Sequence, residues 1–283
     1  MLKRIAAAPA VMVLAASVAV QLPLALASAA AWAGQPENWR IGFQEPATEG
    51  ARSLQDFHDL LTIIIVAITL FVTVLLGYVM WRYRASRNPE PAQFSHNTVI
   101  EVLWTIIPVI ILVVIAIPSF NLLYFLDRTA EPELTINVTA QQFSWVYEYP
   151  DNGGMTIYST MKQQDALEEG EPYLLAVDNP MVVPIDTNVQ LLITSQDVLH
   201  SFGVPSFALK TDAVTGRTNE TWFKAVRTGV FYGQCSEICG ANHAYMPIEI
   251  RVVEQDEFEQ WVASQQADQG VVPDSDTSLA ALD

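Results

Sequence analysis

Residues 60–81 read LLTIIIVAITLFVTVLLGYVMW and contain no charged side chain. At about 1.5 Å per residue, a helix of this length matches the roughly 30 Å hydrocarbon core of a bilayer. Residues 102–126 form a second uncharged run, in which neighbouring helices can accommodate Pro108 and Pro118. The sequence therefore predicts a transmembrane hairpin over 60–126, with helices at 60–81 and 102–126.

The connection between the two runs, residues 82–101, predicts the orientation of the hairpin. It carries Arg82, Arg84 and Arg87. Basic residues concentrate in cytoplasmic loops. We therefore expect a multi-pass membrane protein with the N-terminus and the C-terminal domain facing outward, into the periplasm or its equivalent.

The N-terminus has the pattern of an export signal. Lys3 and Arg4 precede an Ala-, Val- and Leu-rich run that ends in Ala31-Trp32-Ala33, an A-x-A pattern. Residues 1–33 are therefore predicted to be a signal peptide that is removed before Gly34. An uncleaved anchor helix is the alternative. Residues 34–59 then form a periplasmic N-terminal segment.

The charge of the chain is uneven. The formal net charge is −17, and residues 127–283 hold 24 acidic and 7 basic side chains, so the imbalance lies in this part. An acidic domain can attract a basic partner over a distance, although acidity also serves simply to keep an exported domain soluble. No basic patch is present that would neutralise phosphates, so a nucleic acid is not an expected partner.

The region after the hairpin has the pattern of a β-sheet domain. Residues 134–139 alternate apolar and polar side chains, and the aromatic-rich run 143–149 ends in the turn-forming residues 150–154. Further candidate strands are residues 173–177, 189–195, 220–225, 230–233 and 248–253. Short strands at this density predict a β-sandwich or barrel over 127–265. The predicted fold class is therefore a membrane-anchored all-β protein.

A short helix is expected after the last strand. Asp256-Glu257-Phe258-Glu259 resembles a capping box, and Phe258, Trp261 and Val262 make one apolar face. We expect this helix to pack on the β domain. Residues 266–283 are predicted to be a C-terminal tail.

The most informative motif lies at residues 235–246. It combines two cysteines, the only two in the chain, with His243 and Met246. In an exported domain a disulfide is the ordinary reading of two cysteines. Gly233, Gly240 and Pro247, however, indicate a tightly turned loop. His200 follows the predicted strand 189–195, which a sandwich can bring beside this loop.

The types of donor favour copper. Zinc also takes Cys and His, but a thioether ligand favours copper. A single blue-copper site needs one Cys, two His and a weak axial Met. The second cysteine therefore suggests two bridging thiolates that hold two copper ions, a centre suited to one-electron transfer. No Cys-x-x-Cys-His is present, so the chain is not expected to carry covalent haem of its own.

Several motifs, in order, closely resemble those of cytochrome c oxidase subunit II. They are HNTVIEVLWT (96–105), DVLHS (197–201), LKTDAVTGR (209–217), YGQCSEICGANH (232–243) and MPI (246–248). The resemblance covers about residues 57–261. It implies an oxidase subunit that takes electrons from cytochrome c and passes them to haem in subunit I. There, within a complex of further subunits, oxygen is reduced to water with proton translocation.

The resemblance also implies the site. A cupredoxin-like domain would hold the dinuclear copper centre called CuA, with Cys235 and Cys239 as bridging ligands. His200 and His243 would each supply a nitrogen, and Met246 and the backbone carbonyl of Glu237 would be weak ligands. The Glu237 carboxylate would reach a magnesium or manganese ion shared with subunit I.

Further roles follow from the same resemblance. Glu101 matches a glutamate near the mouth of a proton-uptake path, although a carboxylate in a first helical turn is also explained by the helix dipole. Glu148, Asp178 and Asp197 match acidic positions of the cytochrome c docking face.

The chain departs from the family at one position. The family usually has Gln-Trp-Tyr-Trp where this chain has Gln142-Phe143-Ser144-Trp145. The first of those tryptophans is the expected electron-entry residue. Electron entry is therefore expected at Phe143, at Trp145 or at Tyr147, or the chain meets a different donor.

Three other classes of protein compete with this interpretation. A quinol oxidase subunit has the same hairpin and sandwich but lacks the copper ligands. Nitrous oxide reductase shares the copper loop but attaches it to a large propeller, for which this chain is too short. A membrane-anchored copper carrier would need neither Glu101 nor the acidic face.

Overall fold

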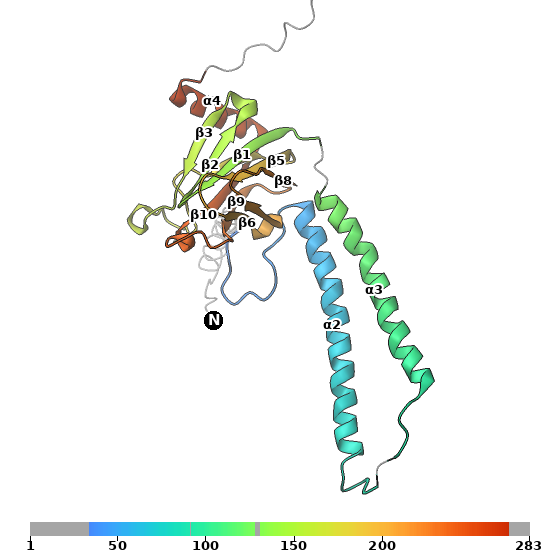
Figure 1. Cartoon of the computed structure of the whole chain (residues 1–283). Helices are drawn as coiled ribbons and strands as arrows, with labels where there is room; N and C mark the ends of the chain where they lie inside the picture. The colour runs from blue at the N-terminus through green and yellow to red at the C-terminus, as the bar shows by residue number, and fades with distance from the viewer. Residues whose placement is uncertain (1–33, 91, 128–130, 272–283) are drawn as a thin grey trace, which may run out of the picture. The chain divides into compact units, whose positions relative to one another are not determined.

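The computed structural model describes residues 34–90, 92–127 and 131–271. Residues 50–127 form one compact unit, and residues 34–49 join residues 131–271 in a second (Figure 1). The predicted signal peptide, residues 1–33, lies outside the described residues.

The first unit is a pair of long helices, α2 (Glu49–Arg82) and α3 (Thr98–Asp127). Both are long and apolar enough to cross a membrane. Each extends beyond the corresponding uncharged run, and α2 begins inside the segment 34–59 that the sequence assigns to the periplasm. Glu49 and Glu101 lie in the first turns, where each interacts favourably with the positive end of its helix dipole.

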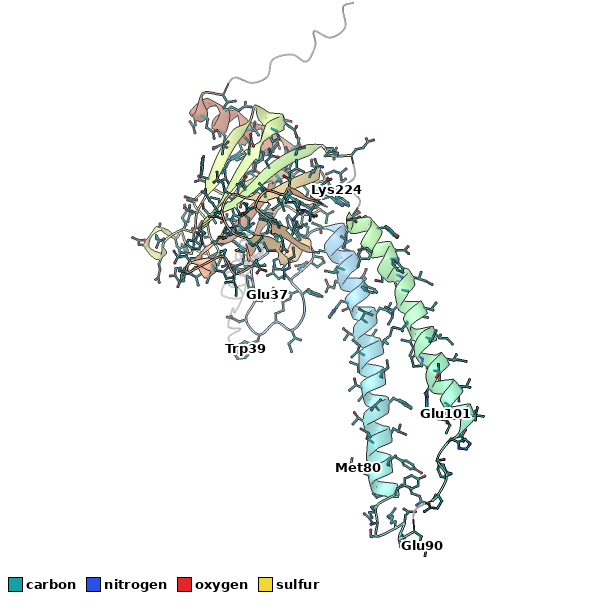
Figure 2. The ribbon with its side chains drawn as sticks, in the orientation of Figure 1. Glu37, Trp39, Met80, Glu90, Glu101 and Lys224 are labelled. Atoms are coloured by element: carbon teal, nitrogen blue, oxygen red, sulfur yellow. The ribbon has the colours of Figure 1, made fainter. Side chains whose placement is uncertain are left out.

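The start of α3 is capped by its own side chains. The Ile100 N–H donates to Asn97 Oδ1 at 3.3 Å, and the Asn97 N–H donates to Glu101 Oε1 at 3.2 Å. Figure 2 shows Glu101 near the end of α3 that adjoins the connection to α2. These bonds satisfy amide groups that a helix start leaves unpaired.

The second unit is a sandwich of two five-stranded sheets. In the first sheet the order is β3 (Met155–Ser159), β2 (Ser144–Tyr149), β1 (Leu134–Gln141), β5 (Asn188–Ser195) and β8 (Asn219–Lys224). In the second sheet it is β4 (Met181–Pro184), β10 (Pro247–Val253), β9 (Gly229–Cys235), β6 (His200–Val204) and β7 (Leu209–Ala213). Two neighbouring pairs, β1–β5 and β4–β10, are parallel, and the other pairs are antiparallel.

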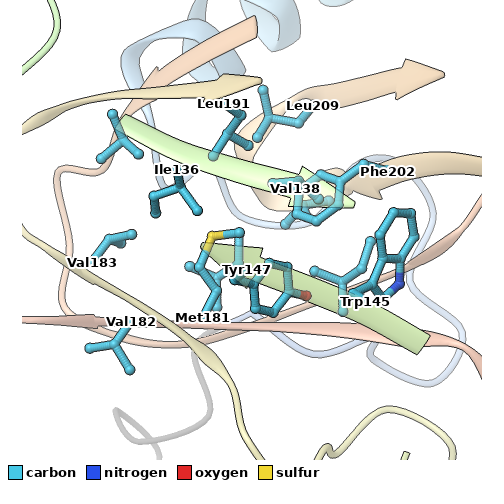
Figure 3. Close-up of a cluster of buried hydrophobic side chains, with 14 of the residues drawn as sticks. Ile136, Val138, Trp145, Tyr147, Met181, Val182, Val183, Leu191, Phe202 and Leu209 are labelled. Atoms are coloured by element: carbon cyan, nitrogen blue, oxygen red, sulfur yellow. The ribbon is translucent and has the colours of Figure 1, made fainter. Parts of the chain in front are cut away.

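Alternating strands build the core between the sheets. β1 and β5 bury every second side chain, as expected of strands with one face on a core. Figure 3 shows Ile136, Val138, Trp145 and Leu191 in this cluster beside Phe202 and Met181 of the second sheet. One polar side chain also joins the sheets, because Tyr149 Oη lies 3.0 Å from both the N–H and the carbonyl oxygen of Val182. The predicted membrane-anchored β-sandwich, of cupredoxin-like class, is confirmed.

Two local predictions were wrong, and four strands, β3, β4, β6 and β7, were not predicted. Residues 173–175 form a turn, not a strand, and Val177 makes only an isolated bridge to Met161. Leu174 has φ 71° and the Ala176 N–H donates to Pro172 O. The last helix, α4 (Gln255–Gln269), has Glu254 as N-cap with no side-chain capping bond, so the predicted capping box does not form. Phe258 and Val262 are buried, as predicted for the face that packs on the sandwich. The helix continues to Gln269, into the predicted tail.

An acidic side chain is buried in the second sheet. Glu249 of β10 is 2% exposed and faces away from the core side of Ile248 and Ile250. The Val177 N–H donates to its Oε2 at 3.1 Å, and Arg251 Nη2 lies 3.4 Å from its Oε1. Burial raises the pKa of Glu249, and the hydrogen bond from Val177 and the charge of Arg251 offset this only in part.

This burial predicts a pH-dependent stability. Because the pKa of Glu249 is higher in the folded than in the unfolded chain, folding stability is greatest below the unfolded-state pKa and falls as pH rises through the folded-state pKa. Glu249→Gln removes this ionisation, so its free energy of unfolding should fall less between pH ~4 and ~8, by on the order of 1 kcal/mol. Urea unfolding of the detergent-solubilised full chain, followed by circular dichroism, measures the difference.

The matched control is Glu169→Gln, because Glu169 is exposed. It should follow the wild-type pH profile. Identical pH profiles for Glu249→Gln and the wild type would contradict the prediction.

Candidate metal centre

The donors predicted from the sequence gather at one end of the second sheet. His200 is the first residue of β6, and Cys235 is the last residue of β9. The loop between β9 and β10 then supplies Cys239, His243 and Met246, with His243 in a short 3-10 helix, η4 (His243–Tyr245). The antiparallel pairing of β6 with β9 sets Phe202 opposite Cys235, so the two strand ends lie side by side.

The donor atoms face one another. The two Sγ atoms lie 3.9 Å apart. His200 Nδ1 is 3.9 Å from Cys235 Sγ, and His243 Nδ1 is 3.6 Å from Cys239 Sγ. Met246 Sδ lies 3.9 Å from Cys239 Sγ. Donor atoms of His200, Cys235 and Cys239 all lie within 4.8 Å of one another. The structure thus brings these five side chains together at one place.

The two cysteines are free thiols rather than a disulfide. A disulfide holds its sulfurs about 2.05 Å apart, whereas these sulfurs are nearly twice as far apart and both thiols are buried. Burial and the neighbouring Cys235 raise the pKa of Cys239 to about 12. The metal-free site therefore keeps this thiol protonated, and a bound metal has to displace the proton.

Asp197 orients His200 by binding Nε2, the ring nitrogen that does not face Cys235. His200 Nε2 lies 2.8 Å from Asp197 Oδ1, and the imidazole is buried. A donor hydrogen on Nε2 leaves the Nδ1 lone pair facing Cys235, the arrangement that carboxylates commonly impose on metal-binding histidines. Burial acts to raise the pKa of Asp197, but hydrogen bonds from His200, Val198 and Gln142 outweigh it and lower this pKa.

Glu237 contributes two groups at different places. Its carbonyl oxygen lies 3.3 Å from Cys235 Sγ, on the inner side of the loop. Its side chain is exposed to solvent. The backbone can therefore face the thiols while the carboxylate remains accessible to a partner.

The three candidates for electron entry differ in exposure. Trp145 and Tyr147 are 0% exposed and belong to the core, so neither can touch a donor protein directly. Trp145 packs edge-on against Phe202 at 5.2 Å between ring centroids, and its ring centroid lies 6.2 Å from that of His200. Phe143 is half-buried and borders a recess of about 470 Å³ that Asn242 and Tyr245 of the loop also line.

The three predicted docking acids already make hydrogen bonds. Glu148 Oε2 accepts a hydrogen bond from Asn137 Nδ2, and the Asp178 carboxylate accepts from the backbone and hydroxyl of Thr160. Asp197 is a partner of His200, as described above. Glu148 and Asp178 are nevertheless exposed, and their charges remain available for long-range attraction.

Sequence reasoning missed Gln142 as a residue of this site. Its Nε2 donates to the carbonyl oxygen of Cys239 at 2.6 Å, and its backbone N–H donates to Asp197 Oδ2 at 2.7 Å. The only signal in the sequence was its place directly before Phe143. Gln142 lies 97 residues before Cys239, and no sequence pattern connects it with the copper loop, residues 235–246.

The donor set fits copper. Thiolates and a thioether are soft ligands, and imidazole suits copper as well as zinc. Two cysteines, each beside its own imidazole, exceed what a single blue-copper ion needs. The residues present therefore fit copper, and they provide no set of oxygen ligands that would favour magnesium or calcium at this position.

Known proteins are similar to this chain in sequence. Residues 134–253 match the family model "Cytochrome C oxidase subunit II, periplasmic domain", and residues 36–122 match that of the transmembrane domain. The probable cytochrome c oxidase subunit 2 of Rickettsia bellii is 48% identical over 241 residues, covering 85% of this chain and 90% of the relative. The cytochrome c oxidase subunit 2 of Chondrus crispus is 42% identical over 233 residues, covering 81% and 92%.

A solved structure is also similar. The periplasmic domain of subunit II of cytochrome oxidase from Bradyrhizobium japonicum is 48% identical, with a TM-score of 0.47, and the match covers 51% of this chain and 100% of that domain. The family models and the relatives confirm the resemblance that the motifs indicate. The chain belongs to the cytochrome c oxidase subunit II family, whose members are parts of an oxidoreductase complex.

Proposed function

We propose that this chain takes electrons singly from cytochrome c at a pair of copper ions and delivers them to haem in subunit I, where oxygen is reduced to water. The observation that carries the proposal is the pair of unbonded, buried thiols 3.9 Å apart, each with a histidine Nδ1 in front of it. Bound copper would supply one-electron oxidation and reduction. The surrounding residues hold the ligands in place and exclude water.

The two cysteines would bridge the coppers, with His200 on one ion and His243 on the other. Met246 and the carbonyl oxygen of Glu237 would be weak ligands. Each lies close to a sulfur, Met246 to that of Cys239 and Glu237 O to that of Cys235. A ligand set held by two strands and one short loop changes little between oxidation states, which favours fast electron transfer.

The outer domain is proposed to lie in the periplasm of a bacterial inner membrane. Arg82, Arg84 and Arg87 lie at or directly after the end of α2, in or beside the connection to α3. The positive-inside rule assigns that connection to the cytoplasm. Glu101, at the same end of α3, would then stand at the cytoplasmic entrance of a proton path that it shares with subunit I.

Phe143 is proposed as the contact for the donor. It borders the recess beside the copper loop, while Trp145 is buried in the core. Glu148 and Asp178 would contribute to the negative face that attracts a basic cytochrome c. The exposed Glu237 carboxylate would reach a magnesium or manganese ion at the boundary with subunit I.

Copper loading tests the centre itself. The detergent-purified full chain should bind two copper ions and give a seven-line hyperfine pattern in its EPR spectrum, because one unpaired electron is shared between two equivalent nuclei. Cys239→Ser removes one of the two bridges and should abolish this pattern. Copper content and EPR spectra measure both.

Ser236→Ala is the matched control, since Ser236 lies in the same loop, is exposed and offers no ligand. It should keep the wild-type spectrum. One copper ion per chain with a four-line pattern would exclude the dinuclear centre.

The two roles of Glu237 can be separated by substitution. Glu237→Gln keeps the backbone carbonyl, so the copper spectrum of the chain should be unchanged. In the assembled oxidase the same variant should lower the bound manganese signal in cells grown with manganese, because a carboxylate ligand of a hard cation is lost. Glu148→Gln serves as the control, and equal manganese content in all three oxidases would contradict the role.

The acidic domain predicts that electron transfer depends on salt. With 24 acidic and 7 basic residues after position 126, the second-order rate with a basic cytochrome c should fall about tenfold or more between ~10 and ~200 mM salt. Stopped-flow reduction of the oxidase measures this rate. A rate that does not change with ionic strength would show that the acidity does not steer the donor.

A further inference from the structure

The turn between β1 and β2 reaches across the sandwich to the copper loop. β1 and β2 belong to the first sheet, whereas the ligands come from β6, β9 and the loop before β10 in the second sheet. Gln142 lies in this turn, between Gln141 of β1 and the start of β2 at Ser144. A contact from here can therefore fix the metal ligands relative to the opposite sheet.

Gln142 makes two hydrogen bonds, which reach both halves of the centre. Its backbone N–H donates to Asp197 Oδ2 at 2.7 Å, and Asp197 Oδ1 lies 2.8 Å from His200 Nε2. Its side-chain Nε2 donates to the Cys239 carbonyl oxygen at 2.6 Å. One residue thus connects the carboxylate behind His200 to the backbone of Cys239.

The two cysteines differ in how the sheet holds them. Cys235 ends β9; its position is fixed by pairing with β6, and its N–H donates to Met246 O. Cys239 lies beyond the strand, in the loop, where no ladder of hydrogen bonds determines the backbone. The bond from the Gln142 amide falls on the cysteine that the sheet does not position.

The neighbouring residues leave little room for another arrangement. Gly240 has φ 142°, and a Cβ added there would lie 2.8 Å from Gln142 Nε2 and 3.1 Å from Phe143 Cζ. The turn therefore packs directly on the backbone of residue 240. The absence of a side chain at Gly240 permits the amide of Gln142 to reach the adjacent carbonyl.

We infer that Gln142 is a positioning residue of the copper centre, which holds Cys239 at a fixed distance from His200 by bonding to the Cys239 carbonyl and, through Asp197, to the imidazole. The inference rests on the proposed function for its biological meaning. The hydrogen bonds of Gln142 to Asp197 and Cys239 form without a bound metal.

Thiol accessibility in the metal-free chain tests the inference. Cys235 and Cys239 are the only cysteines, so a thiol reagent reports on this loop alone. Gln142→Ala removes the side-chain amide but keeps the backbone N–H to Asp197. The rate at which Cys239 is modified, followed by peptide mass spectrometry on the detergent-purified full chain, should rise about fivefold to tenfold, because the loop opens more often.

Gln141→Ala is the matched control. Gln141 is the preceding residue and its amide bonds locally to Ser144 Oγ at 2.9 Å. Gln142→Asn is a second variant that keeps an amide but shortens the side chain by one methylene, so it should behave like Gln142→Ala even if the alanine variant fails to fold. Faster modification of Cys239 in the Gln142 variants, with wild-type rates in Gln141→Ala and unchanged urea midpoints, supports the role.

Wild-type rates in both Gln142 variants would overturn the inference, and so would an equal acceleration in Gln141→Ala. The copper-loaded Gln142 variants should also show an altered optical and EPR spectrum relative to Gln141→Ala. Failure of the wild-type chain to bind a copper pair would refute the proposed function, whereas the labelling of metal-free thiols would still decide the role of Gln142.

Discussion

The pairing of β6 with β9 is the constraint on which the metal centre depends. It sets Phe202 opposite Cys235 and places His200, two residues earlier, beside the end of β9. The loop from β9 to β10 then returns to a neighbouring strand, so its ends are fixed by the sheet. A loop with fixed ends can bring Cys239, His243 and Met246 to a common centre without a large loss of entropy on binding metal.

Without a bound metal, ionisation of the two thiols of the centre is unfavourable. Two thiols are buried beside each other, and burial together with Cys235 raises the pKa of Cys239 to about 12. Deprotonating both sulfurs without a cation between them would place like charges 3.9 Å apart in a region of low dielectric. The donor atoms are thus already close together, but the thiols stay protonated until a bound metal provides the compensating positive charge.

Support for the centre comes from outside the sheet that contains the ligands. Asp197 orients His200, and Gln142 connects Asp197 to Cys239 from the opposite sheet. Asp197 was expected on a docking face from the resemblance, yet its oxygens accept hydrogen bonds from His200, Val198 and Gln142. Its contribution to the site is therefore first to hold the imidazole, whatever its charge adds to the surface.

The burial pattern explains only part of the strand predictions, because β3 and β7 alternate and were missed, whereas β10 is buried almost throughout and was predicted. β1 and β5 alternate buried and partly exposed side chains, and both were predicted. β4 and β6 are buried at every position, so they carry no period of two and were missed. The opposite error at residues 173–177 arose from apolar composition in a segment where Pro172 and the backbone of Leu174 form a turn.

The sequence alone determined the membrane hairpin, the β-rich outer domain and the set of candidate metal ligands. These depend on uncharged length, on alternation and on side-chain chemistry, all of which are local properties. Only the tertiary structure decided which atoms face one another, that Trp145 and Tyr147 are inaccessible, and that Gln142 belongs to the site. Those facts depend on contacts between segments about 50 to 100 residues apart, such as Gln142 with Asp197 and Cys239, and no local pattern encodes them.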